Sequence, residues 1–134
     1  MSTEPEERLR TRPEDRFAGE SHVYDLDAAL RDLRAEAHPA KNGRRQVTLF
    51  HRPPVTHALF SFEPGGFLAD HSTGGLVTIH CLEGSLEVQA DGETFPLKAR
   101  GVVVLSPRVV HSVRATGQTG GAMLLTVCLE KGEG

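Results

Sequence analysis

Residues 71–84, HSTGGLVTIHCLEG, decide the fold. After two glycines, Val77, Ile79 and Cys81 fall at every second position, and Thr78 and His80 lie between them. Successive side chains of a β-strand point to opposite faces of the sheet, so apolar residues at period two mark a strand with one buried face. The segment therefore predicts a half-buried strand, with a histidine before it and a Glu-Gly turn after it.

Similar short strands are predicted on both sides of this segment. The Asp91-Gly92 pair between SLEVQA and ETFPL is typical of a tight β-hairpin, and HSVRAT alternates again. The apolar run GVVVL is typical of a strand buried on both faces. Many short strands separated by turn residues indicate an all-β sandwich or barrel. The predicted strands are residues 46–51, 56–63, 85–90, 93–97, 101–105, 111–116 and 122–130.

The N-terminal third of the chain has a different pattern. Residues 1–20 carry ten charges and two prolines, which predicts a flexible tail. Residues 21–45 are expected to form a short amphipathic helix and a linker, with Asp25 as the N-cap. The barrel domain is then residues 46–134. The apolar stripe of the helix, spaced by three and four residues, consists of Leu26, Ala29, Leu30, Leu33 and Ala37.

Composition excludes several classes of function. A net charge of -3 provides no basic surface for nucleic acid, and no apolar run is long enough to span a membrane. The sequence has no phosphate-binding glycine loop, so no nucleotide cofactor is expected. Cys81 and Cys128 lie in apolar stretches without CxxC spacing, which favours two buried thiols over a disulfide. Together these features favour a cytoplasmic protein.

From about residue 46 to residue 130 the chain resembles a small single-domain cupin, an RmlC-like jelly-roll β-barrel. The first cupin motif is Gly, five residues, His, one residue, His, then a Glu and a closing Gly. Gly65, His71 and Gly84 match its glycines and its first histidine. The second motif resembles the segment from Arg100-Gly101 through VVVL to Ser106-Pro107 and His111. The Asp91-Gly92 hairpin lies between the two motifs, as expected.

The resemblance implies a divalent metal (Fe, Mn, Ni, Zn or Cu) inside the barrel. Cupins of this type hold it with three histidines and one glutamate. His71 and His111 match the first and the last histidine of that set. Thr73 occupies the position of the second histidine, and Val77 occupies the position of the glutamate. The resemblance therefore implies a reduced ligand set of two histidines, with Thr73 as a group that could orient a bound water.

Strand phase gives an independent prediction for the histidines. His111 shares a face with Val113 and Ala115, which predicts that it points into the barrel. His80 shares a face with Thr78, opposite Ile79 and Cys81, so only a β-bulge would make it a third ligand. Asp70 is the nearest carboxylate to His71, but neighbouring strand residues point to opposite faces. The predicted pocket lining is Thr73, Val77, Ile79, Cys81 and Val113, and Cys81 is an alternative nucleophile.

Two functions fit these residues. In the first, a metal held by His71 and His111 serves a small enzyme, such as an oxygenase, isomerase or decarboxylase. In the second, the barrel has lost its metal, and the two histidines bind a small organic ligand or each other without catalysis. A jelly roll leaves sheet edges to be covered, so a homodimer is expected in either case. The helix and residues 46–51 are expected near its interface.

Overall fold

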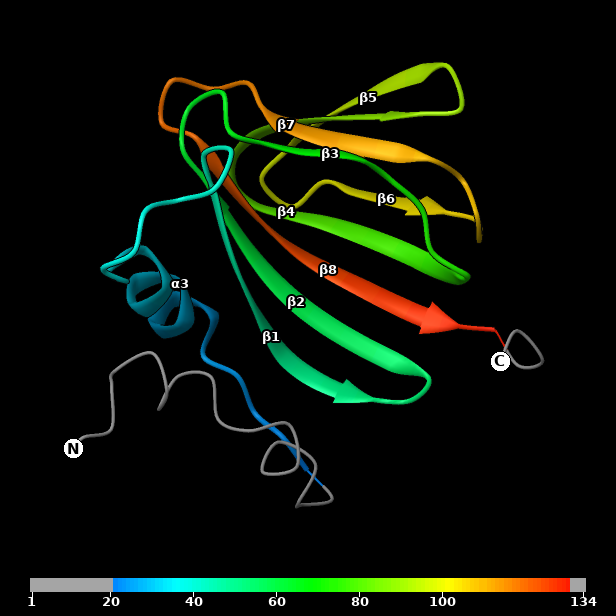
Figure 1. Ribbon diagram of the computed structural model, residues 1–134, viewed down its shortest axis with the longest axis horizontal. Helices are drawn as coiled ribbons and strands as arrows, with labels where there is room; N and C mark the ends of the chain where they lie inside the picture. Colours follow the sequence, from blue (N-terminus) through cyan, green and yellow to red (C-terminus); the bar gives the residue numbers. More distant parts are fainter. Residues whose placement is uncertain (1–20, 131–134) are drawn as a thin grey trace.

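The computed structural model describes residues 21–130, and the predicted tail at residues 1–20 lies outside this range. Eight antiparallel strands form two facing layers, as predicted for an all-β jelly roll (Figure 1). One layer has the strand order β1-β2-β8-β4-β6, and the other has the order β5-β4-β7-β3. The strands are β1 (Arg44–Arg52), β2 (Val55–Phe62), β3 (Phe67–His71), β4 (Gly75–Ala90), β5 (Glu93–Lys98), β6 (Val102–Leu105), β7 (His111–Ala115) and β8 (Gly121–Leu129).

The long strand β4 joins the two layers. Its first half pairs with β6 and β8, and its second half pairs with β5 and β7. Between the halves, the register with β8 shifts between Cys81 and Glu83, and Gly84 adopts φ +70°. A Cβ at Gly84 would collide with the carbonyl oxygen of Gly120, so only glycine fits this bend. The Glu-Gly turn of the sequence is therefore the corner of the barrel.

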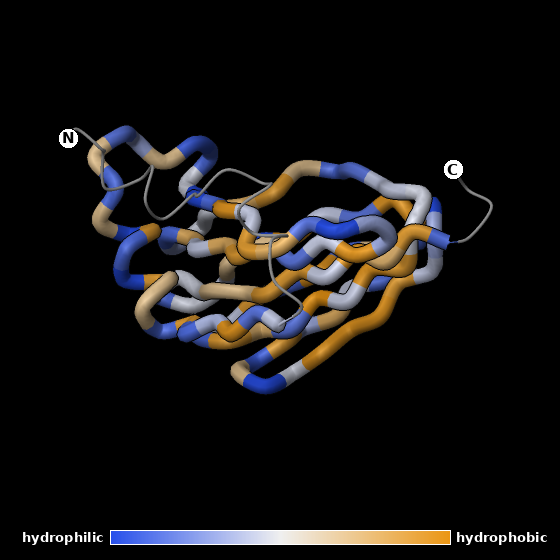
Figure 2. Tube along the Cα trace, turned by 90° about the horizontal axis from the view of Figure 1, so that it is seen from below, coloured by the Kyte–Doolittle hydropathy of each residue, from blue (hydrophilic) through white to orange (hydrophobic). Residues whose placement is uncertain are grey.

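A continuous apolar core fills the space between the layers. It follows from the period-two pattern, because inward residues of facing strands interdigitate. Figure 2 shows hydrophobic residues along the strands and hydrophilic residues at several of the turns. The fully buried core side chains of largest volume include Ile79, Leu86, Val88, Val113 and Met123.

A second apolar cluster lies under the helix α3 (Leu26–Arg34). Leu30 and Leu33 pack against Val47 of β1 and Leu59 of β2, as the helical stripe predicts. The side chain of Asp25 accepts a hydrogen bond from the Ala28 amide at 3.0 Å, which confirms the N-cap. Ala37 was wrongly assigned to the stripe. The helix ends at Arg34 and Ala37 is exposed, because the chain turns toward β1 earlier than the apolar spacing suggests.

Three further predictions are corrected by the structure. The run GVVVL is not buried on both faces, since Val102 is 49% and Val104 is 57% exposed in the outermost strand of its layer. Cys128 is half-buried rather than buried, because it lies on the outer side of β8. Strand β3 was not among the predicted strands, since the alternation in FLADH is weak.

No helix within residues 21–130 is both long enough and apolar enough to cross a membrane.

Candidate functional site

The two predicted histidines lie side by side at one end of the barrel. His71 ends β3 and His111 begins β7, and the two residues face each other across this ladder. Their ring centroids are 4.1 Å apart and their planes are tilted by 57°. The loops at residues 72–74 and 106–110 border this end of the barrel, which we call the barrel mouth (Figure 1). His71 and His111, which are 40 positions apart in the chain, thus form a pair of neighbouring imidazole rings.

Backbone carbonyls orient both imidazole rings. Nδ1 of His71 lies 3.0 Å from the carbonyl oxygen of Ala69, and Nδ1 of His111 lies 3.0 Å from that of Val109. A carbonyl oxygen only accepts, so each Nδ1 carries a proton, and in a neutral ring Nε2 then keeps a lone pair. Sequence reasoning missed these acceptors, because any residue supplies a backbone carbonyl.

His111 is the buried member of the pair. It is 1% exposed, and its Nε2 has no hydrogen-bond partner among the described residues. Burial lowers the pKa of His111, because the charged ring would lose its solvation. The Val109 carbonyl opposes this shift in pKa, nearby His71 adds to it, and Asp70 opposes it. The ring is therefore neutral at pH 7, which leaves a buried electron pair available to a ligand.

The predicted pocket lining is divided between the core and the barrel mouth. Val77, Ile79, Cys81 and Val113 are all buried in the apolar core of the barrel. The Thr73 hydroxyl is engaged in its own loop, where it accepts from the Gly75 amide at 3.0 Å and donates to the Gly75 carbonyl at 3.2 Å. Burial also raises the pKa of the Cys81 thiol, although a backbone hydrogen bond with Glu83 works in the opposite direction. A protonated thiol is a poor nucleophile, which argues against catalysis by Cys81.

No third ligand joins the pair within the described residues. His80 pairs regularly with Val102 and Leu124 on the outer face, and the register shift of β4 comes only after Cys81. The bulge that would make His80 a ligand is therefore in the wrong place. Asp70 lines grooves on the outer side of β3 instead of the barrel interior. Residues 21–130 contain no group of three His, Cys, Asp or Glu side chains that could hold a metal.

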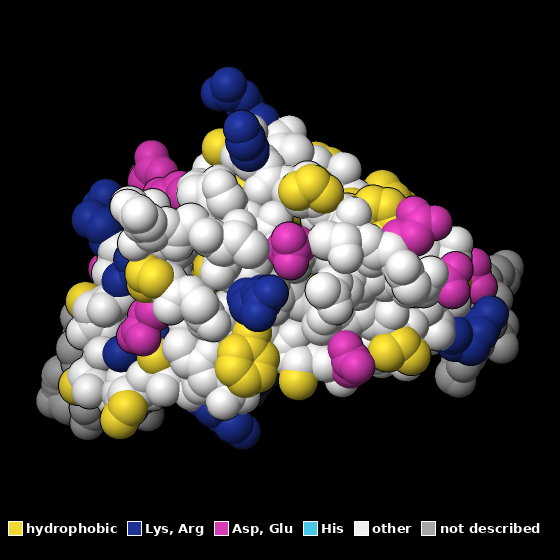
Figure 3. Space-filling view, turned by 90° about the horizontal axis from the view of Figure 1, so that it is seen from above, with side chains coloured by type: hydrophobic (Ala, Val, Ile, Leu, Met, Phe, Trp, Pro, Cys, Tyr) yellow, Lys and Arg dark blue, Asp and Glu magenta, His cyan; other side chains and the backbone are white. Residues whose placement is uncertain are grey.

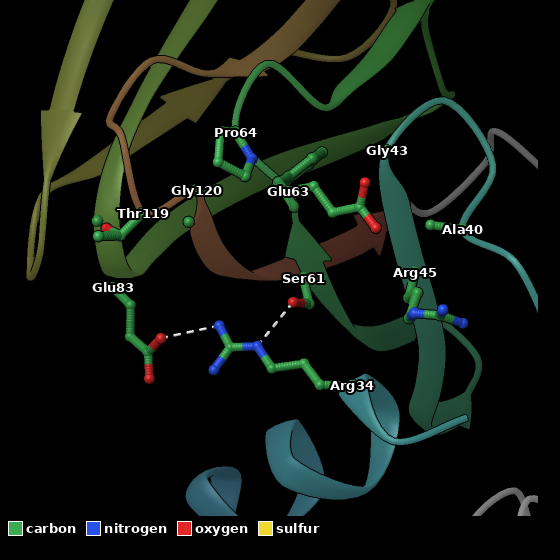
Figure 4. A pocket seen from close by; sticks show the side chains of 13 residues that line it. Arg34, Ala40, Gly43, Arg45, Ser61, Glu63, Pro64, Glu83, Thr119 and Gly120 are labelled. Atoms are coloured by element: carbon green, nitrogen blue, oxygen red, sulfur yellow. Dashed lines mark hydrogen bonds and ion pairs between the residues drawn. The ribbon is translucent and has the colours of Figure 1, made fainter. Parts of the chain in front are cut away.

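A separate hollow of about 410 Å³ lies at the opposite end of the barrel, beneath the end of α3 (Figure 4). Both of its arginines are already paired. Arg34 donates to Glu83 at 2.8 Å and to Ser61 at 2.9 Å, and Arg45 donates to the carbonyl oxygen of His38. The bonds of Arg34 attach the end of the helix to β2 and β4. Arg34 at the edge of the hollow therefore anchors the helix, and the histidine pair remains the candidate site.

The fold and the paired histidines can now be compared with known proteins. The cupin domain family matches residues 58–128, which is more than half of the chain. The chain belongs to the cupin domain family. Comparison with curated proteins gives no significant match.

Several solved structures share this fold at low sequence identity. The cupin domain of Schizosaccharomyces pombe Cnp3 is 16% identical with a TM-score of 0.66, over 81% of this chain and 74% of that one. KdgF from Halomonas sp. is 17% identical with a TM-score of 0.60, over 73% and 90% of the two chains. A predicted oxalate decarboxylase from Thermotoga maritima is 22% identical with a TM-score of 0.62, over 65% and 81%. At these identities the likeness shows the fold alone.

Proposed function

We propose that this cupin binds a small molecule through a divalent metal ion held by His71 and His111 at the barrel mouth. The observation that supports the proposal is the buried Nε2 of His111, which has no hydrogen-bond partner among the described residues and belongs to a residue directly opposite His71 in the ladder. Leaving a polar atom buried without a partner costs free energy, so such an atom favours any ligand that supplies the missing contact. Neutral imidazole nitrogens suit Zn, Cu, Fe and Ni.

The neighbouring residues have defined tasks in this proposal. The carbonyls of Ala69 and Val109 hold the Nδ1 protons and thereby direct Nε2 toward the ion. The burial of His111, which is 1% exposed, limits the access of water to its ring. A bound ion would act as a Lewis acid toward a small ligand. With only two protein donors it would keep open positions, so oxygenation, isomerisation and decarboxylation are the reactions to be assayed first.

The test is metal binding by the untagged full chain, measured by calorimetry with Zn²⁺, Ni²⁺ and Cu²⁺. We expect about one ion per chain, and at least about 10-fold weaker binding in His111→Gln and in His71→Gln. His80→Gln is the matched control, because His80 lies on the outer face, and it should bind as the wild type does. His71 is half-buried, so its variant tests the proposal even if His111→Gln fails to fold. Equal binding by all four proteins, or none by the wild type, would refute the metal site.

A metal-free binding module is the second candidate function. The observation that favours it is Val77, which occupies the position of the glutamate in the cupin motif. Val77 is apolar and only 2% exposed, so it supplies no ligand to a metal. In this case the two Nε2 atoms accept hydrogen bonds from a small organic ligand. The melting temperature would then be unchanged by chelator and by metals, but raised by a compound from a metabolite library. A rise in melting temperature with metals alone would exclude this alternative.

A further inference from the structure

A tight turn at the start of β1 places two cationic residues directly opposite each other. The amide of Lys41 donates to the carbonyl of Arg44 at 3.1 Å, and the amide of Arg44 donates back to the carbonyl of Lys41 at 2.9 Å. Between them Asn42 and Gly43 adopt φ +54° and +69°, as in a hairpin turn with two left-handed residues. Directly opposite residues share a face, and like charges in this arrangement are destabilising. The turn therefore holds two positive charges together at a cost in stability.

A hollow of about 340 Å³ lies beside this turn. Three of its lining residues are cations, and no carboxylate of the described residues lines it. Its histidine, His38, has Nε2 3.2 Å from the buried carboxylate of Glu36. Arg45 also borders the hollow of Figure 4, where its side chain extends away from Arg34. The space, which we call the basic hollow, is lined by His38, Pro39, Lys41, Arg44, Arg45 and Gln46.

Neutral oxygen atoms hold the two guanidinium groups of the basic hollow. Arg44 donates through Nε to the side-chain oxygen of Gln46 at 3.0 Å and through Nη1 to the carbonyl of Phe67 at 3.3 Å. Nη1 of Arg45 donates to the carbonyl of His38. These acceptors orient the side chains but carry no net charge. Within residues 21–130, no carboxylate forms an ion pair with any of the three cations, so their positive charge is not neutralised.

Two arginines outside the basic hollow do form ion pairs. Arg34 lies 2.8 Å from Glu83, and Arg114 lies 3.6 Å from Glu87 on the outer face of the other layer. Figure 3 shows acidic and basic side chains interspersed on that face. The whole chain carries a net charge of -3, so composition alone does not explain three unneutralised cations in one small hollow. Such a local concentration of positive charge attracts anions.

We propose that the basic hollow binds the phosphate group of a small phosphorylated molecule. Each guanidinium keeps N–H donors in its planar fork, which can bind two oxygen atoms of one anion, and the ammonium of Lys41 adds a point charge. A phosphate monoester carries a charge of about -1.5 to -2 at pH 7 and three acceptor oxygens, so it matches three cations better than a single carboxylate does. Its binding also relieves the repulsion between Lys41 and Arg44. The volume of the hollow suits a small molecule.

This site is separate from the histidine pair. Arg45 is the ladder partner of Ser61, which lines the hollow at the end of the barrel opposite His71 and His111. The inference therefore goes beyond the proposed function and holds whether or not a metal binds at the barrel mouth. The basic hollow lies between β1 and the segment that follows α3, so a bound phosphate would attach that segment to the sheet. Binding should then raise the melting temperature.

The test is calorimetric titration of the full chain, in phosphate-free buffer, with glycerol 3-phosphate as the probe. We expect about one probe molecule per chain, with a dissociation constant of about 1 mM or lower. Lys41→Gln and Arg44→Gln should each weaken binding by at least about 10-fold, because each removes one charged donor. Arg52→Gln is the matched control, since Arg52 is exposed at the other end of the same strand. Arg52→Gln and His71→Gln should both bind as the wild type does.

Lys41→Gln gives a second measurement without the probe. Removing one of two opposed like charges should raise the melting temperature in phosphate-free buffer by about 1–4 °C. The additional rise that the probe causes in the wild type should be lost in the same variant. A purely structural role of Lys41 predicts the reverse, a lower melting temperature with an unchanged response to the probe.

Several outcomes would overturn the proposal. The first is no binding by the wild type at about 10 mM probe. The second is equal affinity in the wild type, Lys41→Gln and Arg44→Gln. An equal loss of affinity in Arg52→Gln would show a response to net charge rather than a site. Loss of binding in His71→Gln would assign the phosphate to the barrel mouth, and either result would also overturn the proposal.

Discussion

At the scale of single residues, the orientation and the burial of a histidine decide whether it is a candidate ligand, more than its residue type does. His111 differs from the other described histidines because its Nδ1 is hydrogen-bonded to the Val109 carbonyl while its Nε2 is buried without a hydrogen-bond partner. The sequence indicated the inward direction of His111 through its phase with Val113. It could not show the 4.1 Å approach to His71, because that distance depends on how β3 pairs with β7. The role of the pair as metal ligands stays a prediction.

Cys81 permits a test at the same scale. In a Cys128→Ser variant Cys81 is the only thiol. Burial raises its pKa, so the reactive thiolate is scarcer than for an ordinary cysteine, and access is blocked as well. We expect almost no reaction with a disulfide reagent at about pH 8 in the folded protein, and full reaction in denaturant. Equal rates in the two states would contradict the buried position.

At the scale of elements, glycines with positive φ decide where strands turn. Gly84 and Gly92 both adopt left-handed conformations, with φ +70° and +77°. A Cβ at Gly92 would meet nothing within 4 Å, whereas one at Gly84 would meet the backbone of Gly120. The sequence predicted both turns. Only the structure distinguishes an open hairpin tip from a corner packed against another chain segment.

This contrast predicts different costs for the same substitution. Gly92→Ala should lower the free energy of unfolding by about 1 kcal/mol, which is the cost of the left-handed conformation alone. Gly84→Ala should lower it by at least about 3 kcal/mol, because the backbone near Gly120 must also shift. Urea denaturation of both variants measures the difference. Losses of equal size would mean that the corner at Gly84 tolerates a side chain.

At the scale of the whole molecule, β4 unites the two layers into one core. Side chains from both of its halves, such as Ile79 and Val88, lie in the same buried cluster. Local unfolding of one layer would therefore expose the inner face of the other. The barrel is expected to unfold in one cooperative step.

A pair of valines tests the contribution of this shared core. Val88 is completely buried between the layers, and Val110 is mostly exposed at the barrel mouth. Val88→Ala should lower the free energy of unfolding by about 2 kcal/mol, through lost burial and the cavity that remains. Val110→Ala should change it by less than about 0.5 kcal/mol. Unfolding followed by circular dichroism should give one transition in each case. A two-step curve for Val88→Ala would show that the layers unfold separately.

The sequence by itself determined the strand pattern, the helix with its Asp25 cap and the family, because these depend on local periodicity and motif spacing. The resemblance to cupins also implied a ligand set of His71 and His111, with Thr73 and Val77 in the other two positions, and this set stays a prediction. Tertiary structure alone decided that these histidines are neighbours, that Val102 and Val104 face outward, and that the helix stops short of them. Such facts depend on which strands pair and what covers each face. They arise from contacts between residues far apart in the chain, which local pattern does not encode.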